Sequence, residues 1–145
     1  MNKQVRGLTL IELVVVITIL GILAAFAVPR FAGLETKARE AAVNGMAGSV
    51  RAAAAMAHST SLVNGFAAAT SVTMEGQTVT MAEFYPTADT AGIVTALADT
   101  SGFDTATAAG EFRLNNAPTA ANCKVTYTAA PVGGVPAVNT TVTGC

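Results

Sequence analysis

Arg6-Gly7-Leu8-Thr9-Leu10-Ile11-Glu12 opens an apolar run in which no further charge occurs before Val28. Leu8 to Val28 is 21 residues, about what an α-helix rising ~1.5 Å per residue needs to cross a ~30 Å hydrocarbon core. An ionised Glu12 near the end of such a span costs roughly 2.5–3.5 kcal/mol. We therefore expect a membrane-spanning helix in which this carboxylate has a charged partner or a function.

Two general kinds of N-terminal segment also begin with basic residues and continue into an apolar run. A secretory signal peptide is supported by Lys3, Arg6 and a possible cleavage site at Ala25-Phe26-Ala27, but its apolar region normally has only about 7–15 residues. Glu12 is also unexpected in such a region. A plain single-span anchor is the other possibility, and in either case Lys3 and Arg6 stay on the cytoplasmic side.

A third possibility rests on a resemblance. Lys3-Gln4-Val5-Arg6-Gly7, followed by Leu8 to Ile17 and later by Pro29-Arg30-Phe31, resembles the class III signal sequence of the type IV pilin superfamily. The resemblance implies that a prepilin peptidase removes residues 1–7 by cutting between Gly7 and Leu8, and that it methylates the new N-terminus at Leu8. Most members of the family have Phe where this chain has Leu8, and we interpret the difference as tolerated.

Removal of the leader gives Glu12 a possible partner. The α-amino group of Leu8 becomes a cation four residues before Glu12, and in a filament the carboxylate can equally reach the amine of a neighbouring subunit. Two charges buried together are tolerable only when they are paired, because a single one carries an uncompensated desolvation cost. We therefore predict that Glu12 is an assembly residue that fixes the register between subunits.

The two cysteines, Cys123 and Cys145, lie near the C-terminus. If the chain is exported, they meet an oxidising compartment, where a disulfide is favoured over free thiols; a loop of this size contributes about 3 kcal/mol in the chain-entropy model. The pair lacks CxxC spacing, and the single histidine, His58, is remote, so a metal site is not expected. By resemblance, a C-terminal disulfide loop marks type IV pilins, whereas the major pseudopilins of type II secretion generally lack one.

The pattern after the apolar run predicts that the helix continues well beyond the membrane. Pro29 removes an intrahelical hydrogen bond and predicts a kink, but helix-forming residues continue to Ala57. An apolar stripe with steps of three and four residues predicts the face that packs on a globular domain. Its members are Val43, Met46, Val50, Ala53 and Ala57. His58 follows this predicted helix, and we expect a satisfied or solvated surface histidine there rather than a ligand or a catalytic residue.

The C-terminal half predicts a β-sheet that packs on this helix. Alternating residues around Glu75-Gly76-Gln77 indicate a hairpin of 71–74 with 78–81, and Asp89-Thr90 is expected to cap a short helix over 91–98. Three further strands are expected at 111–114, 124–128 and 138–142. The predicted fold class is therefore α+β, a long N-terminal helix packed against a C-terminal antiparallel sheet, as in the ladle-like architecture of pilins.

A second resemblance covers part of this half. Phe84-Tyr85-Pro86, Asn122-Cys123-Lys124-Val125-Thr126-Tyr127 and the final Gly144-Cys145 are similar to mannose-sensitive-haemagglutinin-type major pilins. The expected division is a leader at 1–7, a transmembrane or filament-core helix at 8–28, and a periplasmic or extracellular head at 29–145.

Composition gives no support to other classes of function. Net charge is −1, only 12% of residues are charged, and the basic residues are scattered, so nucleic-acid binding is not expected. No phosphate-binding loop or G-x-S-x-G motif occurs, so we predict no catalytic residues and no cofactor. Asp99 and Asp104 lack the spacing of a Ca²⁺ loop, and we interpret them as exposed loop carboxylates rather than metal ligands.

The sequence therefore predicts a structural subunit of a type IV pilus, held in the inner membrane as a prepilin with its N-terminus cytoplasmic and later polymerised into an extracellular filament for surface adhesion or motility. By resemblance, its partners are further copies of itself, a prepilin peptidase, and an assembly platform with its ATPase. The alternatives are a pseudopilin of a type II secretion system and an exported soluble binding domain.

Overall fold

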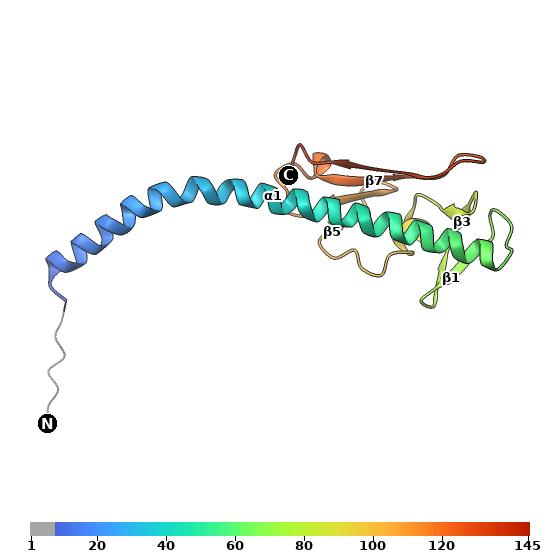
Figure 1. Ribbon diagram of the computed structural model, residues 1–145, viewed down its shortest axis with the longest axis horizontal. Coiled ribbons are helices and arrows are strands. Elements are labelled where there is room, and N and C mark those ends of the chain that lie inside the picture. Colours follow the sequence, from blue (N-terminus) through green and yellow to red (C-terminus); the bar gives the residue numbers. More distant parts are fainter. Residues whose placement is uncertain (1–7) are drawn as a thin grey trace, which may run out of the picture. The chain divides into compact units, whose positions relative to one another are not determined.

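The computed structural model describes residues 8–145, which fall into an N-terminal unit ending at Thr36 and a C-terminal unit, Lys37–Cys145 (Figure 1). The predicted leader, residues 1–7 with Gly7, lies outside the described residues. Residues 8–145 contain one long α-helix, two short helical turns and a series of short antiparallel strands, so the predicted α+β class is confirmed.

Helix α1 (Leu10–Val63) runs six residues beyond the predicted end at Ala57. The prediction was wrong there because hydroxyl residues can stay helical by bonding to their own helix: the Ser59 hydroxyl donates to the Ala55 carbonyl at 2.9 Å. The helix ends at Val63, and two residues later Gly65 adopts a φ of 63°, which suits glycine after a helix end. There the Gly65 N–H donates to the Leu62 carbonyl and the Phe66 N–H to the Ser61 carbonyl, the two bonds of a Schellman motif.

The core of the C-terminal unit forms between α1 and the strands. All five residues of the predicted apolar stripe, from Val43 to Ala57, are buried, together with Ala47 and Ala54. They belong to one cluster with residues from the strands and from the turn after them. These partners are Val72, Val79, Met81, Ile93, Phe112, Val125 and Tyr127. The stripe was therefore correctly interpreted as ordinary core packing.

Two hairpins follow α1. Strands β1 (Val72–Met74) and β2 (Gln77–Val79) form a hairpin at the predicted place. Its second strand is 77–79 rather than 78–81, because Gln77 pairs opposite Met74 and Met81 belongs to the next hairpin. Its two-residue turn, Glu75-Gly76, has positive φ at both positions. A second hairpin, β3 (Met81–Ala82) with β4 (Tyr85–Pro86), was not predicted, because strands of two residues leave no alternating pattern.

A four-stranded antiparallel sheet completes the C-terminal unit in the order β5-β6-β7-β8 (Figure 1). Strands β6 (Glu111–Leu114), β7 (Lys124–Thr128) and β8 (Ala137–Thr141) confirm the three predicted strands within one residue. The edge strand β5 (Phe103–Asp104) and a 3₁₀ turn, η2 (Ala120–Asn122), were not predicted. Burial alternates along β7, where Val125 and Tyr127 face the core.

The predicted helix at 91–98 is reduced to one π-helical turn, η1 (Thr90–Val94). Its cap was predicted correctly, since the Asp89 carboxylate accepts a hydrogen bond from the Gly92 N–H at 2.7 Å. Gly92 is buried, and a Cβ placed on it would overlap the backbone of Thr87. This close approach holds the turn against the residues that precede it.

We predict that Gly92→Ala lowers the free energy of unfolding of the C-terminal unit by about 1–3 kcal/mol, because the new methyl group overpacks against backbone. Gly48→Ala is the matched control: Gly48 is helical, and nothing lies within 4 Å of its Cβ position. That change should raise stability by up to ~1 kcal/mol. Denaturant unfolding of the detergent-solubilised full chain measures both, and equal effects would contradict the close approach at Gly92.

Candidate assembly site

The first part of α1 and the two residues before it present apolar side chains on every side. The large apolar residues from Leu8 to Leu34 are between 43% and 80% exposed. They are Leu8, Leu10, Ile11, Leu13, Val14, Val15, Val16, Ile17, Ile19, Leu20, Ile22, Leu23, Phe26, Val28, Phe31 and Leu34. Helix α1 is long and apolar enough to cross a membrane, judged by length and a mean hydropathy of 2.8 in its most apolar window. A soluble monomer rarely exposes so large an apolar surface, so this surface requires lipid or protein to cover it.

The polar side chains of Thr9, Glu12 and Thr18, which lie within this apolar segment, form hydrogen bonds to residues three positions away in the sequence. Glu12 Oε2 accepts hydrogen bonds from the Thr9 N–H at 2.8 Å and from the Thr9 hydroxyl at 2.7 Å. The Glu12 N–H donates to the Thr9 hydroxyl oxygen at 3.4 Å. These reciprocal contacts form a capping box at the start of α1. The Thr18 hydroxyl donates to the Val15 carbonyl at 2.8 Å.

The role of Thr9 was missed by sequence reasoning, although the spacing Thr-x-x-Glu is the known signal for a capping box. Among the other predicted site residues, Leu8 is 79% exposed, just before the helix. Pro29 lies inside α1, which continues through it. The kink at Pro29, cleavage before Leu8 and methylation of Leu8 stay predictions.

The comparisons with known proteins bear on this N-terminal geometry. Residues 2–28 match the family described as the prokaryotic N-terminal methylation motif. Over 54 residues the chain is 52% identical to the type IV narrow pilus major component PilA5 of Thermus thermophilus. This chain therefore has an N-terminal segment that matches that methylation motif, and it is similar over part of its length to a type IV pilus component. The aligned region is 37% of this chain and 47% of PilA5, so the chain spans about half the length of this curated relative. No solved structure matches the chain.

The predicted disulfide is confirmed. Cys123 and Cys145 are bonded, with their Cα atoms 4.9 Å apart, and both are buried. The Thr119 N–H donates to the Gly144 carbonyl at 3.0 Å, and the Gly144 N–H donates to the Asn122 carbonyl at 2.9 Å. A Cβ on Gly144 would overlap Thr119, so glycine lets the final residues lie directly against the η2 turn.

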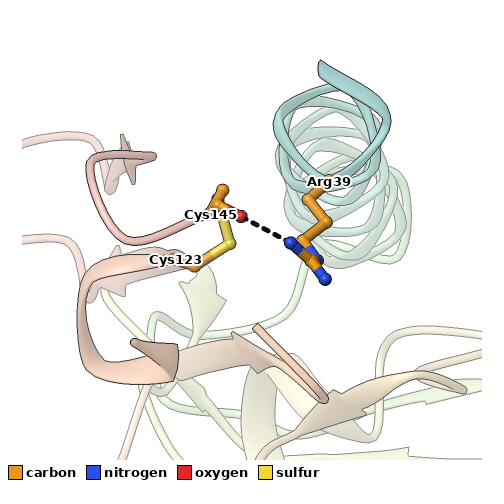
Figure 2. The surroundings of a disulfide bond; sticks show 3 residues. All are labelled: Arg39, Cys123 and Cys145. Carbon is orange, nitrogen blue, oxygen red and sulfur yellow. Dashed lines mark hydrogen bonds between the residues drawn. A yellow bond between two sulfur atoms is a disulfide. The ribbon is translucent and has the colours of Figure 1, made fainter. Parts of the chain in front are cut away.

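An arginine on α1 contacts this disulfide loop. Arg39 Nη1 donates to the Cys145 carbonyl oxygen at 3.0 Å, as Figure 2 shows. The contact joins residues that are 106 positions apart in the sequence, and nothing in the local pattern around Arg39 predicted it. It ties the last residue of the chain to the helix within the C-terminal unit.

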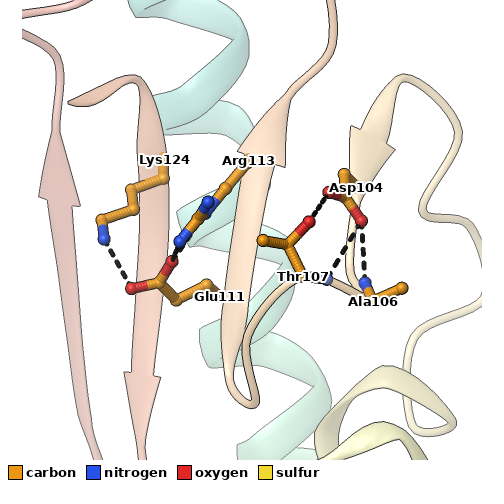
Figure 3. A network of polar contacts seen from close by, with 6 residues as sticks. All are labelled: Asp104, Ala106, Thr107, Glu111, Arg113 and Lys124. Carbon is orange, nitrogen blue, oxygen red and sulfur yellow. Dashed lines mark hydrogen bonds and ion pairs between the residues drawn. The ribbon is translucent and has the colours of Figure 1, made fainter. Parts of the chain in front are cut away.

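A charged network crosses the sheet from β6 to β7. Glu111 Oε2 contacts Arg113 Nη2 at 2.7 Å, and Glu111 Oε1 contacts Lys124 Nζ at 2.5 Å (Figure 3). The hydrogen bond from Lys124, supported by Arg113, lowers the pKa of Glu111 against the opposing effect of burial. The three side chains are only 16–24% exposed, so this network is better shielded than an ordinary surface ion pair.

The two aspartates considered as metal ligands act in turns instead. Asp104 accepts hydrogen bonds from the Ala106 N–H at 2.8 Å and from the hydroxyl of Thr107 (Figure 3). It is half-buried on β5, which corrects the expectation of an exposed loop residue. Asp99 is exposed and accepts from the Ser101 N–H at 2.8 Å. The hydrogen bond from Thr107 lowers the pKa of Asp104, and the hydrogen bond from Ser101 lowers the pKa of Asp99. Within residues 8–145, no group of three or more potential ligands is placed to hold a metal.

His58 lies inside α1 rather than after it, and it is half-buried rather than on the surface. Its Nδ1 is 3.0 Å from the Phe84 carbonyl oxygen, and its ring stacks on Tyr85 with centroids 4.1 Å apart. Close by, the Tyr127 hydroxyl donates to the Pro86 carbonyl at 2.8 Å, and burial raises the pKa of Tyr127 to about 12. These contacts give His58 a structural role in attaching the β3–β4 hairpin to α1.

We predict that Glu111→Gln lowers the free energy of unfolding at pH 7 by about 1–2 kcal/mol, because two cations lose their charged acceptor. The folded pKa of Glu111 lies below the ordinary 4.5, so its contribution is present above that value and is lost as pH falls through the folded pKa. Unfolding measured from pH 7 to pH 3 should show the two proteins converging in acid. A constant difference across this range would contradict the assignment.

Proposed function

We propose that this chain is the structural subunit of a type IV pilus. The observation that carries the proposal is the exposed apolar surface of residues 8–34, in a segment that matches an N-terminal methylation motif. Lipid covers this surface in the precursor, and copies of the same helix cover it in the filament. Burial against other copies stabilises the filament by roughly 25 cal/mol per Å² of apolar surface removed from water.

The proposed processing follows from the same segment. A prepilin peptidase removes residues 1–7 and methylates Leu8, while the helix from 8 to 28 holds the subunit in the inner membrane with its leader cytoplasmic. An assembly platform and its ATPase then extract the subunit into an extracellular filament that serves adhesion or motility. Residues 29–145 form the periplasmic and later extracellular part.

The proposed role of Glu12 is compatible with its contact to Thr9. The capping bonds to the carboxylate use Oε2, and an ionised carboxylate has about four acceptor sites. The Thr9 N–H also survives removal of the leader. Glu12 can therefore cap its own helix and also form an ion pair with the Leu8 ammonium group, either of the same subunit or of a neighbour.

A pilus subunit is favoured over a pseudopilin by the C-terminal disulfide. Cys123 and Cys145 close the loop that, by the resemblance described above, marks pilins rather than major pseudopilins. The buried sulfur atoms and the hydrogen bond from Arg39 make this loop an integral part of the C-terminal unit.

The processing proposal predicts the mass of the mature protein. Intact mass and N-terminal sequencing without reduction should give a chain that starts at Leu8, carries one additional methyl group and lacks the two thiol hydrogens of Cys123 and Cys145. A mature chain that starts at Val28 would instead indicate a secreted domain without Glu12, and would contradict a pilus subunit.

Substitution of Glu12 separates its charge from its capping role. Glu12→Gln keeps an oxygen that can accept from Thr9, since glutamine also serves in capping boxes, but it leaves the Leu8 amine unpaired. We expect sheared filaments, counted by electron microscopy, to fall at least about tenfold, because an unpaired buried charge costs several kcal/mol. Thr9→Ala is the control, because it weakens the cap by about 1 kcal/mol and retains the charge. Normal filaments from Glu12→Gln would refute the charge-pair role.

A further inference from the structure

The C-terminal unit has its own exposed apolar surface, and most of that surface lies at one end. Six of its large apolar side chains are exposed. Five of them lie in two segments, which are the end of α1 with the loop after it and the β7–β8 loop; the sixth is Met56. The other five, here called the end patch, are Leu62, Val63, Phe66, Val132 and Val135, which are between 37% and 90% exposed. Figure 1 shows the end of α1 and the β7–β8 loop at the same end of this unit.

The turn between β3 and β4 joins the two segments of the end patch. The Phe84 N–H donates to the Ala68 carbonyl at 2.8 Å, which holds the turn against the loop after α1. The Gly133 N–H donates to Glu83 Oε2 at 3.3 Å, which holds it against the β7–β8 loop. Both segments of the end patch are therefore attached to the turn that carries Glu83.

This turn keeps an unfavourable backbone conformation. Glu83 and Phe84 have φ of 50° and 67°, a combination that normally selects Asn-Gly and costs other residues roughly 1–2 kcal/mol each. The contacts with Ala68, Gly133 and His58 maintain it. Backbone strain of this kind concentrates at functional sites. Glu83 is the one charged residue among residues 62–68, 83–85 and 131–136. The strained turn therefore fixes a single carboxylate next to apolar segments.

Another segment of the same chain has the complementary character. Residues 26–34 read Phe-Ala-Val-Pro-Arg-Phe-Ala-Gly-Leu and contain one charge, the cation of Arg30. Phe26, Phe31 and Leu34 are 63–76% exposed. The end patch, with the turn attached to it, has a single anion in its segments, and residues 26–34 form an apolar segment whose sequence contains a single cation. An open filament requires two different faces on each subunit that fit one another.

We propose that the end patch of one subunit binds residues 26–34 of a second copy, with Glu83 paired to the Arg30 of that copy. This inference rests on the proposed function, because it assigns a second contact within the same filament. In parallel helices, contact between Arg30 and Val63 sets an axial offset of roughly 50 Å at ~1.5 Å per residue. Pairing of Glu12 with a neighbouring Leu8 amine requires an offset of only a few residues, so the two contacts involve different neighbours.

A charge exchange tests the pairing. Glu83→Lys and Arg30→Glu each place like charges in contact, which costs several kcal/mol, so each should reduce sheared filaments at least about tenfold. The double variant restores opposite charges and should recover most of the filaments. Loss in the single variants without recovery in the double variant would overturn the proposal, and so would unchanged assembly of Glu83→Lys.

Glu75→Lys is the matched control. Like Glu83, Glu75 is a glutamate with positive φ in a two-residue hairpin turn, with φ of 49°; Glu75 is exposed, whereas Glu83 is half-buried. The change therefore repeats both the charge reversal and the backbone demand outside the end patch. It should leave filament number unchanged, and an equal loss would overturn the pairing. Absence of filaments from the unmodified chain would contradict the proposed function itself, whereas normal filaments with an inert Glu83→Lys contradict only this contact.

Discussion

A single helix must satisfy two different environments, and the rest of the structure depends on this constraint. From Leu10 to Leu34, α1 is exposed and almost entirely apolar, so it is stable only where lipid or protein surrounds it. From Val43 to Ala57 only one stripe is buried, and it belongs to the core that the strands complete. The sheet and hairpins therefore cover one part of the helix and leave the other part for a different partner.

The sequence predicted those features that repeat along the chain. The stripe from Val43 to Ala57 and the alternation in β6, β7 and β8 reflect burial on one face, which leaves a period of about 3.6 or 2 residues. Features that depend on single distant contacts left no such signal. The donation from Arg39 to Cys145 and the strained turn at Glu83 arise only when segments far apart in the sequence meet. Two stretches, Ser59-Thr60-Ser61 and Asn64-Gly65, are both possible signals for the end of α1. The second one marks the true end, because α1 ends at Val63.

The candidate site shows the same division. Glu12 was identified because a charge in an apolar run is unusual, whereas its local partner Thr9 was missed because threonine is ordinary in any helix. A capping box and a charge pair are different requirements on one side chain. The first is seen in the hydrogen bonds from Thr9 to Glu12, and the second is the proposed pairing with the Leu8 amine of the same subunit or of a neighbour. Glutamate suits both requirements, because its carboxylate has more acceptor capacity than Thr9 uses.

The Cys123–Cys145 bond has a mechanical consequence. In the proposed pilus, a filament that attaches cells to surfaces would be under tension, and a chain under tension lengthens as its strands separate. The covalent link removes the 22-residue separation between the two cysteines from the length that tension can release, roughly 70 Å at ~3.3 Å per extended residue. Strands β7 and β8, with the loop that carries Val132 and Val135, lie inside this closed ring, so this part of each subunit resists stretching even when the hydrogen bonds around it yield.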